Sequence, residues 1–369
     1  MEPLPIPSPI SHLPPPIMRI VVAMSGGVDS SVAAALLARA GHDVVGLSMQ
    51  LYDQSGGDIR FGSCCTLDDL YDARRVAARL GVPHYIVNFE RQFDDHVVSN
   101  FVREYASGRT PIPCVHCNGD LKFASLVERA RAFDADAVAT GHYAQVDVDP
   151  ETGLRRLKRG VDPAKDQSYF LFTLSQDQLA GAVFPVGALD KPTVREEARR
   201  LGLAVAEKPD SQEICFVAAG EHADFVRRRA AIPGGVIRDT EGRVLGRHDG
   251  VHRFTIGQRK GLGLSGPVPL YVIDIDAKNA AVTVAPRGAL ERTALTASGV
   301  NWISGAAPGG PVRAAARIRH RHADATATIT PIAADRASVV FDAPQTAVTP
   351  GQAVVFYDGD VVLGGGWID

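Results

Sequence analysis

The sequence predicts an α/β protein that begins with a doubly wound parallel sheet and continues through a small central α+β domain to a C-terminal β-barrel. Three observations support this prediction. Strand and helix patterns alternate from residue 20 to residue 140, apolar alternation between glycine-rich turns follows Cys215, and only short strands and turns follow Pro286. Strands that alternate with helices are typical of parallel sheets covered on both faces, and short strands separated by turns are typical of barrels.

The expected elements of the first part follow one another in regular order. They are strands at residues 20–24, 43–51, 84–89 and 137–140, and helices at residues 29–40, 67–80, 94–107 and 120–133. Ligands of such sheets bind at the carboxyl ends of the strands. Residues 25–30, Met49 and residues 140–143 all follow strands, so we expect these three segments to meet in one crevice.

The later domains are predicted from their turns and short apolar runs. A short helix is expected around residues 223–229, and the stretch YVIDID alternates as a strand does. Barrel strands are expected at residues 312–318, 325–329, 338–341 and 353–357. The predicted boundaries are a disordered proline-rich tail at 1–17, the sheet domain at 18–213, the central domain at 214–286 and the barrel at 287–369.

Composition and charge limit the functions to consider. Of the 369 residues 45% are hydrophobic, which is ample for several cores, and the net charge of −3 restricts any nucleic-acid contact to local basic patches. Residues 1–17 lack the features of a signal peptide, and no stretch approaches the roughly 18 apolar residues of a membrane span. The five cysteines do not suggest a secreted disulfide framework. We therefore expect a cytoplasmic protein without a membrane partner.

The stretch VVAMSGGVDSSVAAALL at residues 21–37 reads as a strand, a glycine turn and a helix. The turn at Ser25, Gly26 and Gly27 should leave backbone N–H groups pointing outward at a helix N-terminus, which is a cradle for an anion. It lacks the GK[ST] ending of the P-loop of kinases and GTPases, and it lacks the GxGxxG of dinucleotide-binding folds. The anion is therefore held in another way.

The hexapeptide SGGVDS resembles the PP-loop of the ATP pyrophosphatases, which cleave ATP between its α and β phosphates. Five further motifs narrow the resemblance, namely GRTPIPCVHCNGDLKF, ATGHYA, KDQSYFL, DSQEICFV and FTIGQRKGLGL. In order and spacing they resemble the tRNA-specific 2-thiouridylase family of the MnmA type. The resemblance covers residues 18–369, and it implies a PP-loop domain, a small central domain and a C-terminal barrel.

The resemblance implies an enzyme that replaces the C2 oxygen of the wobble uridine of tRNA with sulfur. ATP, with Mg²⁺, would adenylate that oxygen, and sulfur from a cysteine persulfide would then displace AMP, so that AMP and pyrophosphate are released. The backbone N–H groups and helix dipole of the turn would hold the departing pyrophosphate. The implied ATP-binding residues are Ala23, Met24, Ser25, Gly26, Gly27, Val28, Asp29, Ser30, Met49 and Gly141.

Two cysteines match positions of the family that carry the sulfur chemistry. Cys117 matches the nucleophile and Cys215 the persulfide carrier, which implies a persulfide-carrying protein as sulfur donor. A helix is expected from Asn118 onward, so its N-terminal dipole would lower the pKa of the Cys117 thiol. Cys64 and Cys65 are interpreted as inert thiols.

Cys114 departs from the family, because some members carry an aspartate there with an acid–base role. Cys114, Cys117 and Cys215 could instead ligate an iron–sulfur cluster with one open iron. A zinc half-site with His116 is a further alternative. The thiol-only persulfide mechanism is the preferred interpretation.

The resemblance also implies tRNA contacts. They are Ile112, Pro113 and Cys114 at the target base, His142, Lys165, Asp166 and Gln167 beside the crevice, and Arg319, His320 and Gln352 in the barrel. The run RIRHRH at residues 317–322 supplies a local positive patch for phosphates, although a solvated surface strand would show the same run.

Two rival functions remain open from the sequence. A PP-loop amide ligase would need neither an essential cysteine nor a barrel for tRNA. A non-catalytic binding module would not need an intact SGGVDS together with both cysteines.

Overall fold

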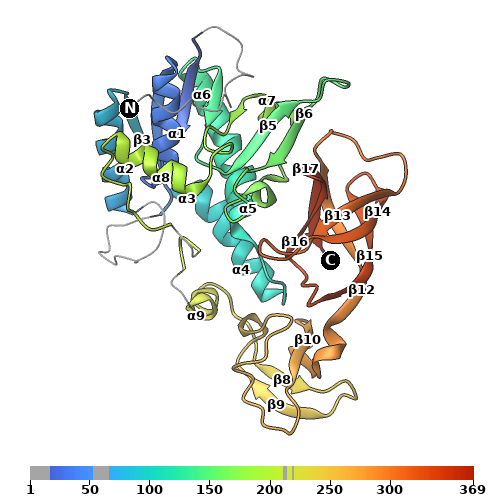
Figure 1. Cartoon of the computed structure of the whole chain (residues 1–369). Coiled ribbons are helices and arrows are strands. Elements are labelled where there is room, and N and C mark those ends of the chain that lie inside the picture. The colour runs from blue at the N-terminus through green and yellow to red at the C-terminus, as the bar shows by residue number, and fades with distance from the viewer. Residues whose placement is uncertain (1–16, 53–65, 211–213, 218–219) are drawn as a thin grey trace. The chain divides into compact units, whose positions relative to one another are not determined.

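A sheet of five parallel strands forms the centre of the first part of the molecule (Figure 1). The computed structural model describes residues 17–52, 66–210, 214–217 and 220–369. These residues divide into two compact units. The first holds the parallel sheet, and the second holds Val97–Cys114 and the chain from residue 220 onward apart from Asp360–Val362. Most of the tail predicted at 1–17 lies outside the described residues.

The sheet confirms the predicted doubly wound class. Its strand order is β3-β2-β1-β4-β7, so the chain starts in the middle of the sheet and later strands are added on both sides. All four pairings are parallel. The strands are β1 (Arg19–Ala23), β2 (Asp43–Gln50), β3 (His84–Asn88), β4 (Ala137–Ala139) and β7 (Ala182–Val183).

Alternate residues of β1 point to one face of the sheet, where three helices bury them. Ile20 and Val22 lie in one core with Val32 of α1, Val76 of α2 and Val194 of α8. This core fixes the end of β1 against the start of α1, which is where the ligand site is expected. The helices are α1 (Val28–Arg39), α2 (Leu67–Leu80) and α8 (Lys191–Arg200).

Two predicted helices have different bounds in the structure. The helix expected at 94–107 begins at Glu90, and the one expected at 120–133 begins at Pro113, because proline suits the first turn of a helix. The prediction that Cys117 directly precedes a helix is therefore wrong. Cys117 lies one turn inside the helical segment that begins at Pro113. The segments are α3 (Glu90–Phe93), η1 (Asp94–Val98, π), α4 (Ser99–Ala106), α5 (Pro113–His116), η2 (Cys117–Phe123, π) and α6 (Ala124–Ala132).

A hairpin of β5 (Ala144–Val148) and β6 (Arg155–Arg159) follows β4 and was not predicted. Lys158 and Leu157 of β6 pair with Val361 and Val362, which places Asp360–Val362 in the first unit. After the hairpin come η3 (Ser168–Leu171) and α7 (Gln176–Ala180). No helix in the described part of the chain is long and apolar enough to cross a bilayer.

The second unit contains the central domain, whose four strands have the order β10-β11-β8-β9. Its core includes Val251, Phe254, Leu262 and Val272. The elements are α9 (His222–Arg227), β8 (Gly235–Arg238), β9 (Val244–His248), η4 (Val251–Arg253), β10 (Tyr271–Asp276), β11 (Ala281–Ala285) and η5 (Arg287–Leu290).

The barrel of the second unit is closed, as predicted. Its strands follow the order β12-β15-β14-β13-β16-β17, and β12 also pairs with β17, which completes the ring. Trp302, Phe341 and Phe356 lie in its core. The strands are β12 (Glu291–Trp302), β13 (Val312–Arg317), β14 (Ala325–Ala333), β15 (Arg336–Thr346), β16 (Ala353–Asp358) and β17 (Val361–Ile368).

Candidate active site

The turn between β1 and α1 is shaped by glycine. Gly26 has a φ of +74°, and a Cβ there would lie 2.1 Å from the carbonyl oxygen of Asp69. No other residue fits this position without moving the start of α2. Gly27 is the N-cap of α1, with φ −88° and ψ 166°. The chain thus passes from strand to helix with little side-chain bulk above the helix end.

The hydrogen bonds of the turn leave this helix end available to a ligand. The Ser30 hydroxyl oxygen accepts from Ser25 N at 3.2 Å and donates to Gly27 O at 3.2 Å, and the Ser31 hydroxyl donates to Gly27 O at 2.8 Å. Among the residues that the structure describes, the N-cap position of α1 has no side-chain capping hydrogen bond. Uncapped backbone N–H groups and the positive end of the helix dipole attract an anion.

The loop after β4 lies directly against this turn. A Cβ on Gly141 would be 2.5 Å from Ser30 N and 2.6 Å from the carbonyl carbon of Asp29, so glycine is required for the close approach. The ends of β1 and β4 therefore meet, as expected from the sheet. Met49 of β2 has an exposed side-chain fraction of only 6% and packs within the fold.

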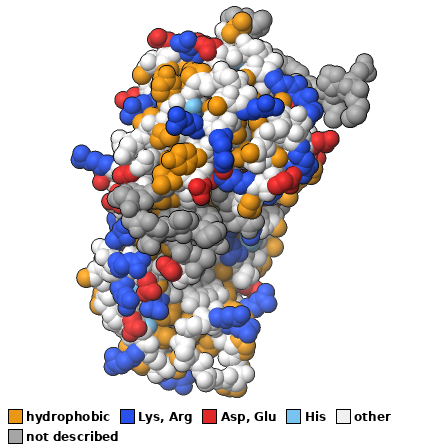
Figure 2. Space-filling view, turned by 90° about the vertical axis from the view of Figure 1, so that its left-hand side faces the viewer, with side chains coloured by type: hydrophobic (Ala, Val, Ile, Leu, Met, Phe, Trp, Pro, Cys, Tyr) orange, Lys and Arg blue, Asp and Glu red, His pale blue; other side chains and the backbone are white. Residues whose placement is uncertain are grey.

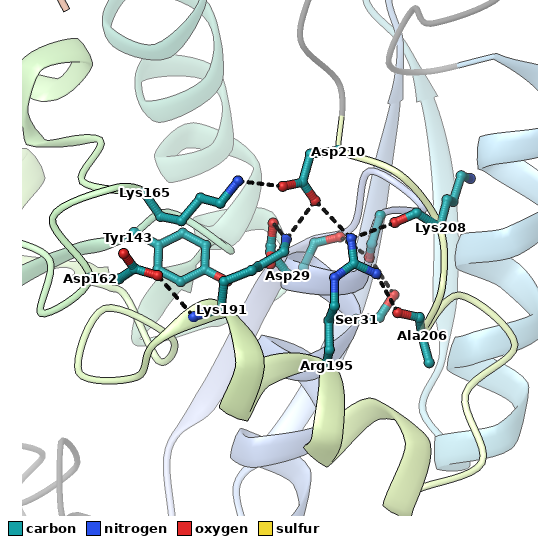
Figure 3. A network of polar contacts seen from close by, with 12 residues as sticks. Asp29, Ser31, Tyr143, Asp162, Lys165, Lys191, Arg195, Ala206, Lys208 and Asp210 are labelled. Carbon is teal, nitrogen blue, oxygen red and sulfur yellow. Dashed lines mark hydrogen bonds and ion pairs between the residues drawn. The ribbon is translucent and has the colours of Figure 1, made fainter. Parts of the chain in front are cut away.

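A network of charged side chains surrounds Asp29 of the turn (Figure 3). Lys191 Nζ of α8 lies 2.7 and 2.9 Å from the two carboxylate oxygens of Asp29 and 2.7 Å from Asp210 Oδ1. The Tyr143 hydroxyl donates to Asp29 Oδ1 at 2.7 Å. Burial and the Asp29 carboxylate raise the pKa of Tyr143, so its hydroxyl keeps its proton and remains a donor.

Asp210 joins this network to two further cations. Its carboxylate contacts Lys165 Nζ at 2.7 Å and Arg195 Nη2 at 3.3 Å. Burial acts to raise the pKa of Asp210, but the hydrogen bonds from Lys165 and Lys191 outweigh it, and the pKa is lowered. The carboxylate therefore stays ionised at neutral pH.

Lys208, two residues before Asp210, clamps the other side of the turn. Its Nζ donates to Gly26 O at 3.0 Å and lies 2.5 Å from Asp69 and 2.6 Å from Asp72. The segment that ends at Asp210 thus contacts the turn through Lys208 directly and through Lys191. The same segment leads on to Cys215.

Sequence reasoning named Lys165 but missed the other cations of this network, Lys191, Arg195 and Lys208. Lys191 and Arg195 are four residues apart on α8 and therefore share a face, but that spacing does not reveal their acidic partners. Asp210 opens the quoted motif DSQEICFV, and Lys208 lies just before it. Their positions in and beside this motif were the only sequence signal that pointed to Asp210 and Lys208 as functional residues.

The three residues Lys165, Asp166 and Gln167 have different surroundings. Asp166 has an exposed fraction of 4% and accepts from the backbone N–H groups of Gly160 and Ser168 at 3.2 and 3.1 Å. Gln167 Oε1 accepts from Tyr143 N at 3.0 Å. The last two side chains hold their own loop, whereas Lys165 reaches the network around Asp210.

His142 packs against aromatic rings beside the turn. Its ring centroid lies 6.3 Å from that of Phe123 and 6.2 Å from that of Phe184, and its Nδ1 is 2.7 Å from Thr140 Oγ1. Burial, with a smaller contribution from Lys122, lowers the pKa of His142 to about 3. The imidazole is therefore neutral at physiological pH.

The candidate sulfur-carrying cysteines differ in exposure. Cys117 is buried at the start of η2, Cys215 is half-buried in the segment 214–217, and Cys114 is exposed on α5. Next to Cys117, the buried Asn118 Oδ1 has no hydrogen-bond partner in the described part of the chain, and neither has Thr173 Oγ1. Cys64 and Cys65 lie outside the described residues.

The metal alternatives find no support in this arrangement. Within residues 17–52, 66–210, 214–217 and 220–369, no three His, Cys, Asp or Glu side chains lie close enough together to hold a metal ion. The described residues therefore give no support to an iron–sulfur cluster on Cys114, Cys117 and Cys215 or to a zinc site with His116.

The remaining predicted tRNA residues lie in the second unit. Gln352 donates to Thr110 O at 2.9 Å, and Arg319 donates to Thr346 O at 3.3 Å. Arg317 of the run RIRHRH is paired with Asp324 at 2.8 Å. The unit also contains Ile112, Pro113 and His320.

Comparison with known proteins agrees with the domain organisation of the chain. Family models match residues 18–219 as "tRNA methyl transferase HUP domain", 223–286 as "tRNA methyl transferase PRC-barrel domain" and 292–368 as "Aminomethyltransferase beta-barrel domain". The first of these spans more than half of the chain. Together they agree with the sheet, the small domain and the closed barrel described above.

Relatives of high identity carry one name. The chain is 53% identical over 358 residues to "tRNA-specific 2-thiouridylase MnmA" of Geotalea uraniireducens, which covers 95% of each chain. It is 54% identical over 370 residues to the protein of the same name from Solibacter usitatus, which covers 96% of this chain and all of that one. The protein of that name from Geobacter metallireducens is 52% identical over 357 residues, covering 95% of this chain and 96% of that one. The resemblance drawn from the motifs is confirmed, and the chain belongs to the tRNA-specific 2-thiouridylase family.

Proposed function

We propose that this protein replaces the C2 oxygen of the wobble uridine of tRNA with sulfur and consumes one ATP, releasing AMP and pyrophosphate. ATP-dependent 2-thiolation of tRNA is the activity of its family. The observation that carries the proposal for this chain is the uncapped N-terminus of α1 behind the Gly26–Gly27 turn. Such a helix end binds the phosphates of a nucleotide.

The turn supports a specific division of ATP. Backbone N–H groups of residues 25–30 would hold the β and γ phosphates, so that the α phosphate faces the uridine oxygen. Attack of that oxygen on the α phosphate forms the adenylated base and releases pyrophosphate. The charge that develops on pyrophosphate is stabilised by the dipole of α1. Mg²⁺ bound with ATP would neutralise phosphate charge, and Asp29 is the carboxylate of the turn that would hold it.

The sulfur step is assigned to the two cysteines of the first unit. The terminal sulfur of a Cys215 persulfide attacks C2 and displaces AMP, which leaves the base joined to Cys215 through a disulfide. The Cys117 thiolate then attacks the Cys215 sulfur, so that 2-thiouridine leaves and a disulfide joins the two cysteines. A thiol reductant and a persulfide-carrying donor protein restore the starting state. We assign this cycle to the cytoplasm.

The tRNA contacts are proposed to follow the family positions. Lys165, Arg319 and His320 would supply the positive charge for phosphates, and the neutral His142 would act as a hydrogen-bonding or stacking group. Asp166 and Gln167 would support Lys165 by holding its loop. Ile112, Pro113, Cys114 and Gln352 complete the proposed set. No observation favours an amide ligase or a non-catalytic module.

A cysteine series tests the mechanism. Cys117→Ser and Cys215→Ser should each abolish thiolation while the ATP-dependent formation of adenylated tRNA continues, because serine neither carries a sulfane sulfur nor opens a disulfide. Cys114→Ser is the matched control and should keep substantial activity in aerobically purified, iron-free protein. If Cys114→Ser is as inactive as the other two, or if activity depends on a rebuilt iron–sulfur cluster, the persulfide route is wrong.

A further inference from the structure

The motif FTIGQRKGLGL forms an exposed loop in the central domain that the proposed function leaves without a role. Phe254 and Leu262, near its two ends, are buried in the domain core. Between them Arg259 and Lys260 are exposed. Gly257 and Gly261 have φ values of +88° and +76°, which allow the chain to turn sharply on either side of these two cations.

The loop is held in one shape by its own hydrogen bonds. Gln258 is the centre of this set: its Oε1 accepts from Thr255 N at 3.0 Å, and its Nε2 donates to Lys260 O at 3.0 Å. The backbone of Gly257 and Gln258 also pairs with Val272 of β10, at 2.8 and 3.0 Å. The two cations therefore stand on a preorganised loop, so little backbone entropy is lost when a ligand binds.

The loop approaches the end of β15, which also accepts a hydrogen bond from Arg319. A Cβ on Gly257 would lie 3.0 Å from the Cβ of Ala347, so the loop touches the end of β15. The neighbouring Thr346 accepts the hydrogen bond from Arg319 at 3.3 Å. All these residues belong to the second unit, and the loop and Arg319 contact neighbouring residues, Ala347 and Thr346.

The cations of the loop are available to an external anion. Lys and Arg side chains are spread over the face in Figure 2 with acidic side chains among them, so pairing rather than number decides which are available. Arg243 of the same domain is paired with Asp239 at 2.7 Å. Arg259 and Lys260, in contrast, have no ion-pair partner in the part of the chain that the structure describes.

We propose that Arg259 and Lys260 bind backbone phosphates of the tRNA and extend the surface that includes Arg319 onto the central domain. The proposal rests on the proposed tRNA function. A nucleic-acid backbone is the occupant that fits, because it presents phosphates in series along such a surface and needs no base-specific groups. The loop supplies affinity and orientation rather than sequence reading.

The test is tRNA binding by full-length Arg259→Ala/Lys260→Ala, measured by filter binding across a series of KCl concentrations. The slope of log K against log [salt] is negative, and each lost phosphate contact should reduce its magnitude by about 0.7 to 0.9. At about 0.15 M salt this corresponds to roughly 4- to 6-fold in affinity per contact, and roughly 15- to 30-fold for both. Arg259→Lys/Lys260→Arg should keep the wild-type slope, and Arg243→Ala is the matched control.

The outcomes separate the inference from the function on which it rests. If the wild type binds and thiolates tRNA but the double alanine variant keeps the wild-type slope, the loop is not a phosphate site. If Arg243→Ala lowers the slope as much, the effect is general charge and the inference is wrong. If the wild type itself does not bind tRNA, the proposed function fails, and this surface fails with it. Melting curves of the variants should match the wild type, since both side chains are exposed.

Discussion

Replacing Lys191 with methionine tests whether the charged network holds the turn at which we propose that ATP binds. The side chain of Lys191 is 9% exposed, and its ammonium is shared by Asp29 and Asp210, whose side chains are 30% and 24% exposed. Methionine is also unbranched and is one atom shorter, and it removes the charge together with the hydrogen-bond donors of Lys191. Both carboxylates then lose their nearest cation, although Asp29 keeps the Tyr143 hydroxyl and Asp210 keeps Lys165 and Arg195.

The size of the effect follows from this partial compensation. Removing one partner of a fully buried ion pair costs about 3–5 kcal/mol, and we expect about 1–3 kcal/mol here because water and the remaining partners still reach the carboxylates. For a domain of this size that lowers the melting temperature by roughly 2–10 °C. The KM for ATP should rise as well, since Asp29 belongs to the turn.

The pH dependence has a defined sign. The pKa of Asp210 is lowered in the folded protein, so its contribution to stability is complete above its ordinary value of 3.8 and disappears as the pH falls through the lowered pKa. The difference in melting temperature between wild type and Lys191→Met should therefore be full at neutral pH and shrink at pH values below about 4.

Thermal denaturation followed by circular dichroism measures this difference, with Arg199→Met as the control on the same helix. Arg199 pairs with Glu207 at 2.6 Å, but the two side chains are 54% and 72% exposed, so its loss should change the melting temperature little. If Lys191→Met melts at the same temperature as Arg199→Met at pH 7, the network does not stabilise the turn and the reasoning is refuted.

Three further predictions concern the neighbouring residues. Gly141→Ala places a Cβ against the first turn of α1 and should raise the KM for ATP at least about fivefold, the equivalent of about 1 kcal/mol of overpacking. Gly181→Ala, which has open space around it, is the control and should leave the KM unchanged; equal KM values for the two variants would contradict the close approach. The His142 ring, with its pKa of about 3, should show no titration by NMR between about pH 5 and 8, and a midpoint in that range would disprove its burial. Asp166→Ala should destabilise the protein by about 1–3 kcal/mol, because two backbone N–H groups lose their acceptor. Lys165→Ala should reduce the magnitude of the salt slope of tRNA binding by about 0.7 to 0.9 and cost less stability than Asp166→Ala, because Asp210 keeps Lys191 and Arg195; the reverse pattern would show that the roles are exchanged.

Much of the fold could be predicted because its strands are apolar and its turns carry glycine. β1 and β2 are mainly apolar and read directly as buried parallel strands, and the glycine turn between β1 and α1 was predicted from Gly26 and Gly27 without any tertiary information. The barrel follows from short strands separated by turns. Its first and last strands, β12 and β17, were missed, since their small and polar residues weaken the alternation.

Other features depend on contacts that no local pattern contains. β6 reads RRLKR, in which Leu157 alone is buried, so the charged residues hide a strand that is fixed by pairing with Val361 and Val362. The start of the helix at Pro113 was missed because the cysteine-containing motif resembles a loop. The partners of Lys191 lie far away in sequence, at Asp29 and Asp210, and only the folded sheet brings them together.

Mass spectrometry of nucleosides from tRNA incubated with the protein, ATP and a persulfide source tests the central claim most directly. We predict 2-thiouridine at the wobble position, with AMP and pyrophosphate each formed in an amount equal to the new base. With Cys215→Ser in place of the wild type, we predict adenylated tRNA and its pyrophosphate but neither 2-thiouridine nor AMP. Unmodified uridine after ATP consumption by the wild type, or ADP and orthophosphate as the primary products, would contradict it.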